Sequence, residues 1–168
     1  CLKFGSDTLK VVVVCWSKNY RVTSGIDWVV DSILYSNISA YGSTITTDAT
    51  GGSFDLLKDI ANLTLSGGEI LGDLVTGKTI RYTTNGLLNL KDVSFNTGNQ
   101  HEAVSVDDQV LMTRMIIEGC SFRNFRDYGL RLMTESKGNQ EAFCLIDNCY
   151  FKNIGVLESS SPTRAIQV

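Results

Sequence analysis

Two stretches of the chain repeat one another: Met115-Ile116-Ile117-Glu118-Gly119-Cys120-Ser121-Phe122-Arg123-Asn124 and Cys144-Leu145-Ile146-Asp147-Asn148-Cys149-Tyr150-Phe151-Lys152-Asn153. Both begin with two apolar residues at alternate positions and end with Phe, a basic residue and Asn. Gly119 or Asn148 stands between these two parts. Alternation with period two is typical of a β-strand, and Gly and Asn accept the left-handed backbone of a tight bend. Each stretch therefore predicts two short strands that meet at a bend.

The same unit recurs through most of the chain when its Phe is taken as the anchor. The anchors follow one another at intervals of 25, 25, 27 and 29 residues and are Ile45, Ile70, Phe95, Phe122 and Phe151. Five positions before them stand Ala40, Leu65, Leu90, Ile117 and Ile146, and seven positions before them stand Ile38, Leu63, Leu88, Met115 and Cys144. Three positions before them stand residues that tolerate a left-handed backbone: Gly42, Gly67, Asp92, Gly119 and Asn148. The sequence therefore predicts a bend at the same place in every unit.

A third strand is predicted after four of the five anchors. Its in-facing pairs are Ile80 and Tyr82, Val104 and Val106, Leu130 and Leu132, and Ile166 and Val168. Three strands in about 25 residues, with like side chains at each level, indicate an all-β, right-handed, single-stranded parallel β-helix, a solenoid in which one unit is one coil. We expect about five coils of 25–29 residues. Their interior should hold an aromatic ladder of Phe95, Phe122 and Phe151 and a thiol pair, Cys120 and Cys149.

The two ends of the chain follow the pattern less well. We expect residues 1–35 to form an N-terminal cap with entry strands, and residues 36–168 to form the β-helix. Within the cap, Val13, Cys15 and Tyr20 could belong to an earlier coil, and residues 24–35 have helical and strand spacing equally. The chain stops at residues 165–168 in what reads as an unfinished strand. We therefore expect the β-helix to continue beyond them.

Composition excludes several classes of protein. The chain has 168 residues, 43% of them apolar, which is enough for one domain with a buried core. Its net charge of −3 argues against a nucleic acid partner, and no apolar run approaches the roughly 18 residues of a membrane span. Five cysteines without a CxxC pair and a single histidine make a structural zinc site improbable. We expect buried thiols, folding in a reducing compartment, and neither a metal nor a cofactor.

The two stretches quoted first resemble repeats of the pectate-lyase-like β-helix superfamily. The segments Tyr20-Arg21-Val22-Thr23-Ser24-Gly25-Ile26 and Tyr41-Gly42-Ser43-Thr44-Ile45 resemble the entry to the β-helix of bacteriophage tailspikes. This resemblance covers about residues 20–168. It implies a homotrimer in a virion tail, assembled in the host cytoplasm, that recognises bacterial surface polysaccharide and cleaves it as a glycosidase or a lyase. No catalytic motif of the superfamily is present, because Asp107-Asp108 lacks the neighbours of the polygalacturonase Asp-Asp pair.

Candidate site residues lie on the third strand and just beyond it. Alternation turns one column of side chains outward on successive coils: Arg81, Ser105, Arg131 and Gln167. Such a column could bind substrate by holding the carboxylate of a uronate or a sialate. Candidate catalytic carboxyls are Asp107, Asp108 and Glu135, since glycoside hydrolysis uses two carboxyls about 5–9.5 Å apart. The alternative is a solvated sheet surface whose charges serve only solubility.

Two outward aliphatic residues, Ile116 and Leu145, predict a covered face, either a trimer interface or a strand overlaid by a long loop. The leading functional hypothesis is a phage tailspike or tail fibre that recognises and cleaves surface polysaccharide. The alternative is a non-catalytic structural or adhesin β-helix of a virion or of an extracellular cell surface. The identity of the glycan and the choice between hydrolysis and elimination are left open by the sequence.

Overall fold

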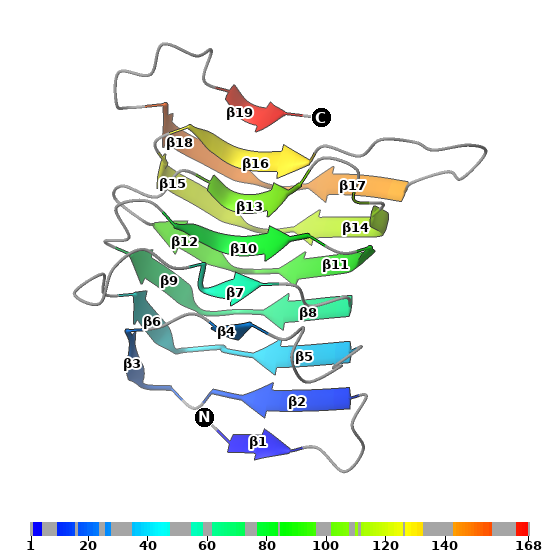
Figure 1. The fold of residues 1–168 in the computed structure, drawn as a ribbon. Helices are drawn as coiled ribbons and strands as arrows, with labels where there is room; N and C mark the ends of the chain where they lie inside the picture. Colours follow the sequence, from blue (N-terminus) through cyan, green and yellow to red (C-terminus); the bar gives the residue numbers. More distant parts are fainter. Residues whose placement is uncertain are drawn as a thin grey trace.

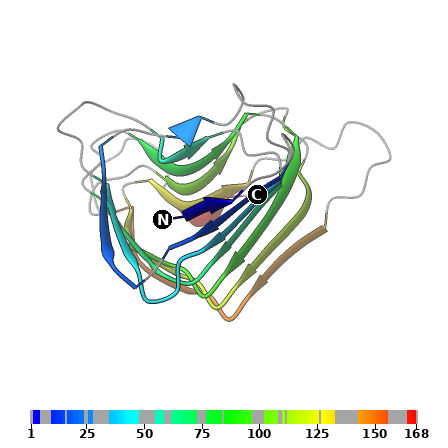
Figure 2. The ribbon, with the colours of Figure 1, turned by 90° about the horizontal axis from the view of Figure 1, so that it is seen from below.

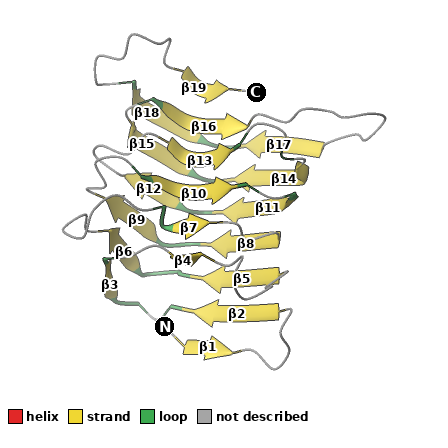
Figure 3. Cartoon of the chain, viewed as in Figure 1, coloured by secondary structure: helices red, strands yellow, loops and turns green. Residues whose placement is uncertain are grey.

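The fold is built from strands alone among the residues that the structure, a computed structural model, describes (Figure 3). These are residues 2–4, 10–15, 17–23, 26–27, 35–47, 55–58, 62–72, 77–83, 85–96, 102–107, 110, 112–125, 127–132, 143–155 and 164–167. Their strands form three sheets, here named A, B and C, each following the length of the molecule (Figure 1).

Each sheet takes one strand from every coil. In spatial order, sheet A holds β1 (Leu2–Phe4), β2 (Lys10–Val14), β5 (Tyr35–Ser39), β8 (Asn62–Ser66), β11 (Gly86–Lys91), β14 (Met112–Glu118) and β17 (Phe143–Asp147). Sheet B holds β3 (Asn19–Val22), β6 (Thr44–Thr47), β9 (Glu69–Gly72), β12 (Ser94–Asn96), β15 (Ser121–Phe125) and β18 (Tyr150–Ile154). Sheet C holds β4 (Ile26–Asp27), β7 (Leu57–Lys58), β10 (Lys78–Tyr82), β13 (Glu102–Val106), β16 (Tyr128–Leu132) and β19 (Arg164–Gln167).

The predicted parallel β-helix is confirmed. Apart from the antiparallel pair β1–β2, every described strand pairing is parallel. Figure 2, viewed along the stack, shows the three sheets surrounding a common interior. The described strands make six coils, one more than expected, because β2, β3 and β4 form an earlier coil. Val13 of this coil pairs with Ile38, and Tyr20 pairs with Ile45.

The first coil also shows which secondary structure part of residues 24–35 adopts, where the sequence allowed either a helix or a strand. Ile26–Asp27 is a strand, β4, which pairs in parallel with β7. Residues 28–34 lie outside the described residues.

The interior is a set of side-chain ladders, as the repeat predicts. The anchors Ile45, Ile70, Phe95, Phe122 and Phe151 are in register from coil to coil. The ring of Phe122 stacks on Phe95 with centroids 5.1 Å apart and on Phe151 with centroids 4.9 Å apart. Phe95 and Phe122 are fully buried. The predicted aromatic ladder is therefore confirmed, and it runs through the core beneath sheet B.

The predicted column of bends is also confirmed. Its members all have positive φ: Gly42 69°, Gly67 70°, Asp92 55°, Gly119 63° and Asn148 49°. At Gly119 an added Cβ would lie 2.5 Å from the Asp92 Oδ1, and at Gly67 it would run into the ring of Tyr41. At Gly67 and Gly119 a larger side chain is therefore disfavoured both by the backbone conformation and by the coil stacked below, whereas Asp92 and Asn148 adopt the same conformation at other levels.

One register prediction was wrong. The anchor spacing aligns Ile38 with Leu63 and Ala40 with Leu65, whereas the structure pairs Ser36 with Leu63 and Ile38 with Leu65. The shift of two residues arises because this bend holds four residues, 40–43, instead of the two found in the later coils. The Ser43 N–H donates to the Ala40 carbonyl oxygen at 3.0 Å, which closes the longer turn.

A second left-handed position, at the next-to-last residue of the sheet B strands β15 and β18, was not predicted. Asn124 and Asn153 have φ of 61° and 53°. The Asn124 Nδ2 donates to the Asn96 Oδ1 at 2.7 Å, and the Asn153 Nδ2 donates to the Asn124 Oδ1 at 2.9 Å. Both residues end the two stretches that define the repeat, so their recurrence was a usable signal. This ladder of amides redirects the chain from sheet B towards sheet C.

We expect Phe122→Ala to lower the free energy of unfolding by about 3–5 kcal/mol, because it removes the central ring of a closely packed ladder. Phe151→Ala is the matched control: Phe151 lies in the same ladder but is partly exposed in the last coil. It should cost less, since part of its surface already contacts water. Urea unfolding followed by circular dichroism measures both. Equal losses for the two variants would contradict the buried ladder.

Candidate functional site

The outer face of sheet C carries the predicted substrate-binding column. Arg81 pairs in register with Ser105, Ser105 with Arg131, and Arg131 with Gln167, so the four residues do align on successive coils. Ser105, however, is fully buried although it lies on the outer face. The side chain of Gln167 lies outside the described side chains. The structure therefore aligns the four residues, but the side chain of Ser105, within this column, is not accessible to solvent.

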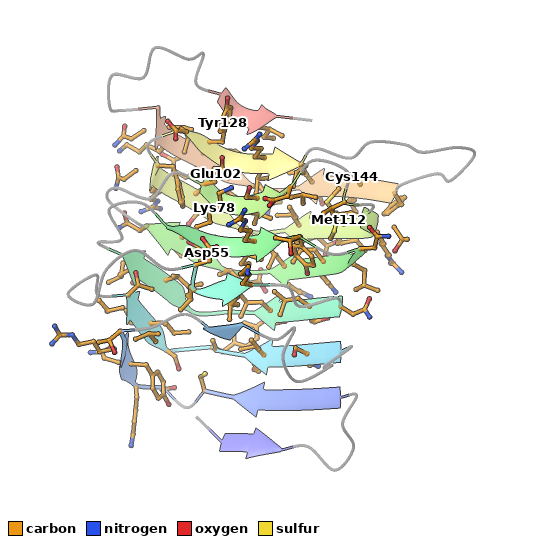
Figure 4. The ribbon with its side chains drawn as sticks, viewed as in Figure 1. Asp55, Lys78, Glu102, Met112, Tyr128 and Cys144 are labelled. Carbon is orange, nitrogen blue, oxygen red and sulfur yellow. The ribbon has the colours of Figure 1, made fainter. Side chains whose placement is uncertain are left out.

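Four residues that were not predicted join this face. Asp55, Lys78, Glu102 and the neighbouring Tyr128 lie in a row across the coils (Figure 4). Strict alternation from Ile80 and Val104 would turn Lys78 and Glu102 into the core. The Lys78 Nζ instead donates to the Ser105 Oγ at 2.8 Å, which places Lys78 on the outer face.

The alternation breaks because small residues occupy the next position of each strand. Thr79 and Ala103 are fully buried, and Gly129 follows them at the same level of β16. A Cβ added to Gly129 would lie 3.0 Å from the ring of Phe151. Two successive residues are buried in each strand, Thr79 and Ile80 in β10 and Ala103 and Val104 in β13, and this breaks the strict alternation. The column Thr79, Ala103 and Gly129 was the sequence signal for Lys78 and Glu102.

Arg81 is held by two carboxylates. Its Nη2 lies 2.7 Å from the Asp107 Oδ2, its Nε donates to the Asp107 Oδ1 at 3.2 Å, and its Nη1 lies 3.3 Å from the Asp55 Oδ2. The hydrogen bond to Asp107 is the main cause that raises the pKa of Arg81, and burial acts in the opposite direction. The Asp55 Oδ1 also accepts the Lys78 backbone N–H at 3.0 Å. Asp107 is therefore occupied in an ion pair of the fork type.

Glu102 is the second centre of the network. Its side chain is only 5% exposed, with the Lys78 Nζ 3.1 Å from Oε2 and the Arg131 Nη1 3.5 Å from Oε1. Oε2 has no aligned hydrogen-bond donor, so its interaction with Lys78 is electrostatic. Lys78 also lies 3.9 Å from the Asp107 Oδ1. Lys78 thus connects two carboxylates, that of Glu102 in β13 and that of Asp107, the residue that follows β13.

Among the described residues, the ion pairs given above join equal numbers of opposite charges. They involve three cations and three carboxylates, namely Lys78, Arg81, Arg131, Asp55, Glu102 and Asp107. Both oxygens of Asp107 are engaged by Arg81, and the network ties neighbouring coils of sheet C together. The other candidate carboxyls, Asp108 and Glu135, lie outside the described residues.

The cysteine thiols were predicted to be buried packing groups. Burial raises the pKa of the Cys120 thiol to about 12, and Cys120 is almost fully buried beside Cys149 in the next coil. Its Sγ donates to the Glu118 carbonyl oxygen at 3.3 Å. A thiol with so high a pKa is a weak nucleophile near neutral pH. Cys144 departs from the prediction, since it is exposed at the last coil.

We expect Glu102→Gln to lower the free energy of unfolding by about 1–3 kcal/mol, because it leaves Lys78 and Arg131 without the carboxylate that they share. The loss should fall short of the 3–5 kcal/mol of a fully buried ion pair, since the side chains of Lys78 and Arg131 are 19% and 31% exposed. Urea unfolding measures it, and 1 M salt should reduce it.

Glu118→Gln is the control for this experiment. Glu118 is half-buried on β14 and forms no ion pair with any described residue. Its replacement should change stability by no more than about 0.5 kcal/mol. Equal effects of the two substitutions would show that the network contributes nothing to stability.

Within the described part of the chain, no group of three or more His, Cys, Asp or Glu side chains is arranged to hold a metal ion. Nor does any helix of that part have the length and apolar character to cross a membrane. Comparisons of the chain with protein-family models, with curated proteins and with solved structures find no match.

Proposed function

We propose that this β-helix belongs to a bacteriophage tailspike or tail fibre and recognises bacterial surface polysaccharide. The observation that carries the proposal is the in-register repetition of polar side chains along the outer faces of the solenoid. Ser94 and Ser121 repeat along sheet B, as do Asn96, Arg123 and Lys152. Arg81 and Arg131 repeat on sheet C, with the buried Ser105 between them. A regular polymer suits such a face, because neighbouring sugar units can meet equivalent groups on neighbouring coils.

The proposal also rests on the resemblance of the repeat units to tailspike β-helices, which is an argument by analogy of fold. A virion tail, assembled in the host cytoplasm, is the location that it implies. An extracellular cell surface is the alternative location.

Cleavage of the polysaccharide is a separate part of the proposal. Hydrolysis needs a carboxyl that can donate a proton and a second one that acts as base or nucleophile. Asp107 is held by Arg81, which favours the alternative function, a non-catalytic structural or adhesin β-helix. A depolymerase would therefore depend on Asp108 and Glu135 rather than on Asp107.

We expect the chain to bind bacterial capsular polysaccharide in affinity electrophoresis. If it also cleaves the polymer, new reducing ends or unsaturated uronates should accumulate, and Asp108→Asn or Glu135→Gln should slow this at least about a hundredfold. Glu118→Gln is the control that should leave both activities unchanged. Binding without cleavage would support the adhesin alternative. Failure to bind any surface polysaccharide would contradict the proposed function.

We also propose that the protein assembles as a homotrimer through the outer face of sheet A. Leu145 pairs with Ile116, and Phe143 pairs with Arg114, on neighbouring strands of that face. Phe143 is 53% exposed, Leu145 is 38% exposed, and Ile116 is half-buried. Burying such surface contributes roughly 25 cal/mol per Å². A closed assembly covers the same face on every copy.

Sedimentation velocity tests the trimer. We expect a species of three chains at micromolar concentration, and we expect Phe143→Glu combined with Leu145→Glu to convert it to monomer. Tyr150→Glu is the matched control, since Tyr150 is 51% exposed but lies on sheet B. A wild-type monomer, or dissociation by the control alone, would contradict assembly through sheet A.

A further inference from the structure

The outer face of sheet B carries two parallel rows of polar side chains at its C-terminal end. In one row Ser94 pairs with Ser121 and Ser121 with Tyr150. In the other row Asn96 pairs with Arg123 and Arg123 with Lys152. Tyr150, Arg123 and Lys152 are all exposed. Since neighbouring strands lie about 4.8 Å apart, the five polar groups and the aromatic ring occupy one small, regular surface.

The two cations on this surface differ from those of sheet C. Among the described residues, no carboxylate pairs with Arg123 or Lys152, whereas Lys78, Arg81 and Arg131 each pair with at least one. Arg123 and Lys152 are also register partners on adjacent strands. Like charges in that position repel one another. An anion bound between them would remove this repulsion and accept hydrogen bonds from both side chains.

Tyr150 adds an exposed aromatic ring to the same surface, against which a sugar ring can pack. The Arg123 guanidinium carbon lies 5.5 Å from the centroid of the Tyr150 ring, a cation–π contact that restrains both side chains. The ring is half-exposed, so part of it is open to a sugar ring. The Ser121 Oγ donates to the Ser94 Oγ at 2.9 Å, which places two hydroxyl groups in the row that leads to Tyr150.

We propose that Arg123, Lys152 and Tyr150 form a binding site for an acidic sugar unit of the polysaccharide. Arg123 and Lys152 bind the carboxylate or sulfate, and the Tyr150 ring packs against the apolar face of the sugar. This inference rests on the proposed function and deepens it. It assigns recognition of the acidic group to sheet B, because the cations of sheet C are neutralised by their own carboxylates.

The test measures the affinity of the full chain for labelled acidic oligosaccharides at low ionic strength. The probes are polygalacturonate, polysialate and chondroitin sulfate oligosaccharides, with dextran as the neutral comparison and an oligo-dT strand as a different polyanion. Arg123→Gln combined with Lys152→Gln should weaken binding of at least one acidic glycan by about tenfold or more. Tyr150→Ala should weaken the same binding several-fold, and Tyr150→Phe should restore it, because the ring does the packing.

The matched control is Lys18→Gln combined with Lys91→Gln, which removes the same charge from two exposed lysines elsewhere, one just before β3 and one at the end of β11. It should leave affinity within about twofold, since those lysines lie outside the site. Thermal unfolding confirms that each variant is folded.

Three results would overturn the inference while leaving polysaccharide recognition intact. They are acidic-glycan binding that the Arg123 and Lys152 substitutions do not weaken, equal loss in the Lys18 and Lys91 control, and equal affinity for dextran. Binding of oligo-dT as tight as that of the acidic glycans would assign the surface to polyanions in general and would overturn the glycan site. Failure of the wild-type chain to bind any of the glycans would overturn both the site and the proposed function.

Discussion

The bend between sheets A and B is the constraint on which the rest of this structure depends. Each coil must turn there while the next coil stacks about 4.8 Å away. The column from Gly42 to Asn148 meets this constraint with positive φ at every level. A larger side chain at Gly67 or Gly119 would collide with the coil stacked below it. The bends therefore keep the coils in register, and the register aligns every ladder in the core.

The ladders follow from that register. The three Phe rings stack at about 5 Å because their strands pair residue for residue. The amides of Asn96, Asn124 and Asn153 form their own ladder at the second turn. The packing of the core rings and the hydrogen bonding of the Asn side chains thus repeat together from coil to coil. Since each coil contacts mainly its neighbours, stability accumulates along the stack in the manner of a one-dimensional repeat protein.

The same register places charges on the outer faces, with different results on two sheets. On sheet C, cations and carboxylates alternate between neighbouring strands and pair with one another, and Glu102 of this network and the adjacent Ser105 are buried. On sheet B, Arg123 and Lys152 stand side by side with the Tyr150 ring adjacent. A self-neutralised face stabilises the solenoid, whereas a face with uncompensated charge retains the capacity to bind an anion. This contrast supports the proposal that sheet B, rather than sheet C, binds the acidic group.

Residue spacing alone determined the fold class, the aromatic ladder and the main bend, because each repeats at nearly constant intervals from Ile45 to Phe151. It also aligned Arg81, Ser105 and Arg131, since alternation holds along that part of each strand. Only the tertiary structure decided the register of β5, where a four-residue turn replaces a bend of two. It also decided the outward position of Lys78 and Glu102, because two successive buried residues follow each of them and interrupt the alternation. It also decided which cations are neutralised. Pairing of charges depends on residues such as Asp55 and Arg81, which lie on different coils and meet only when the coils stack. Periodicity records what every coil shares, whereas these features arise from differences between one coil and the next.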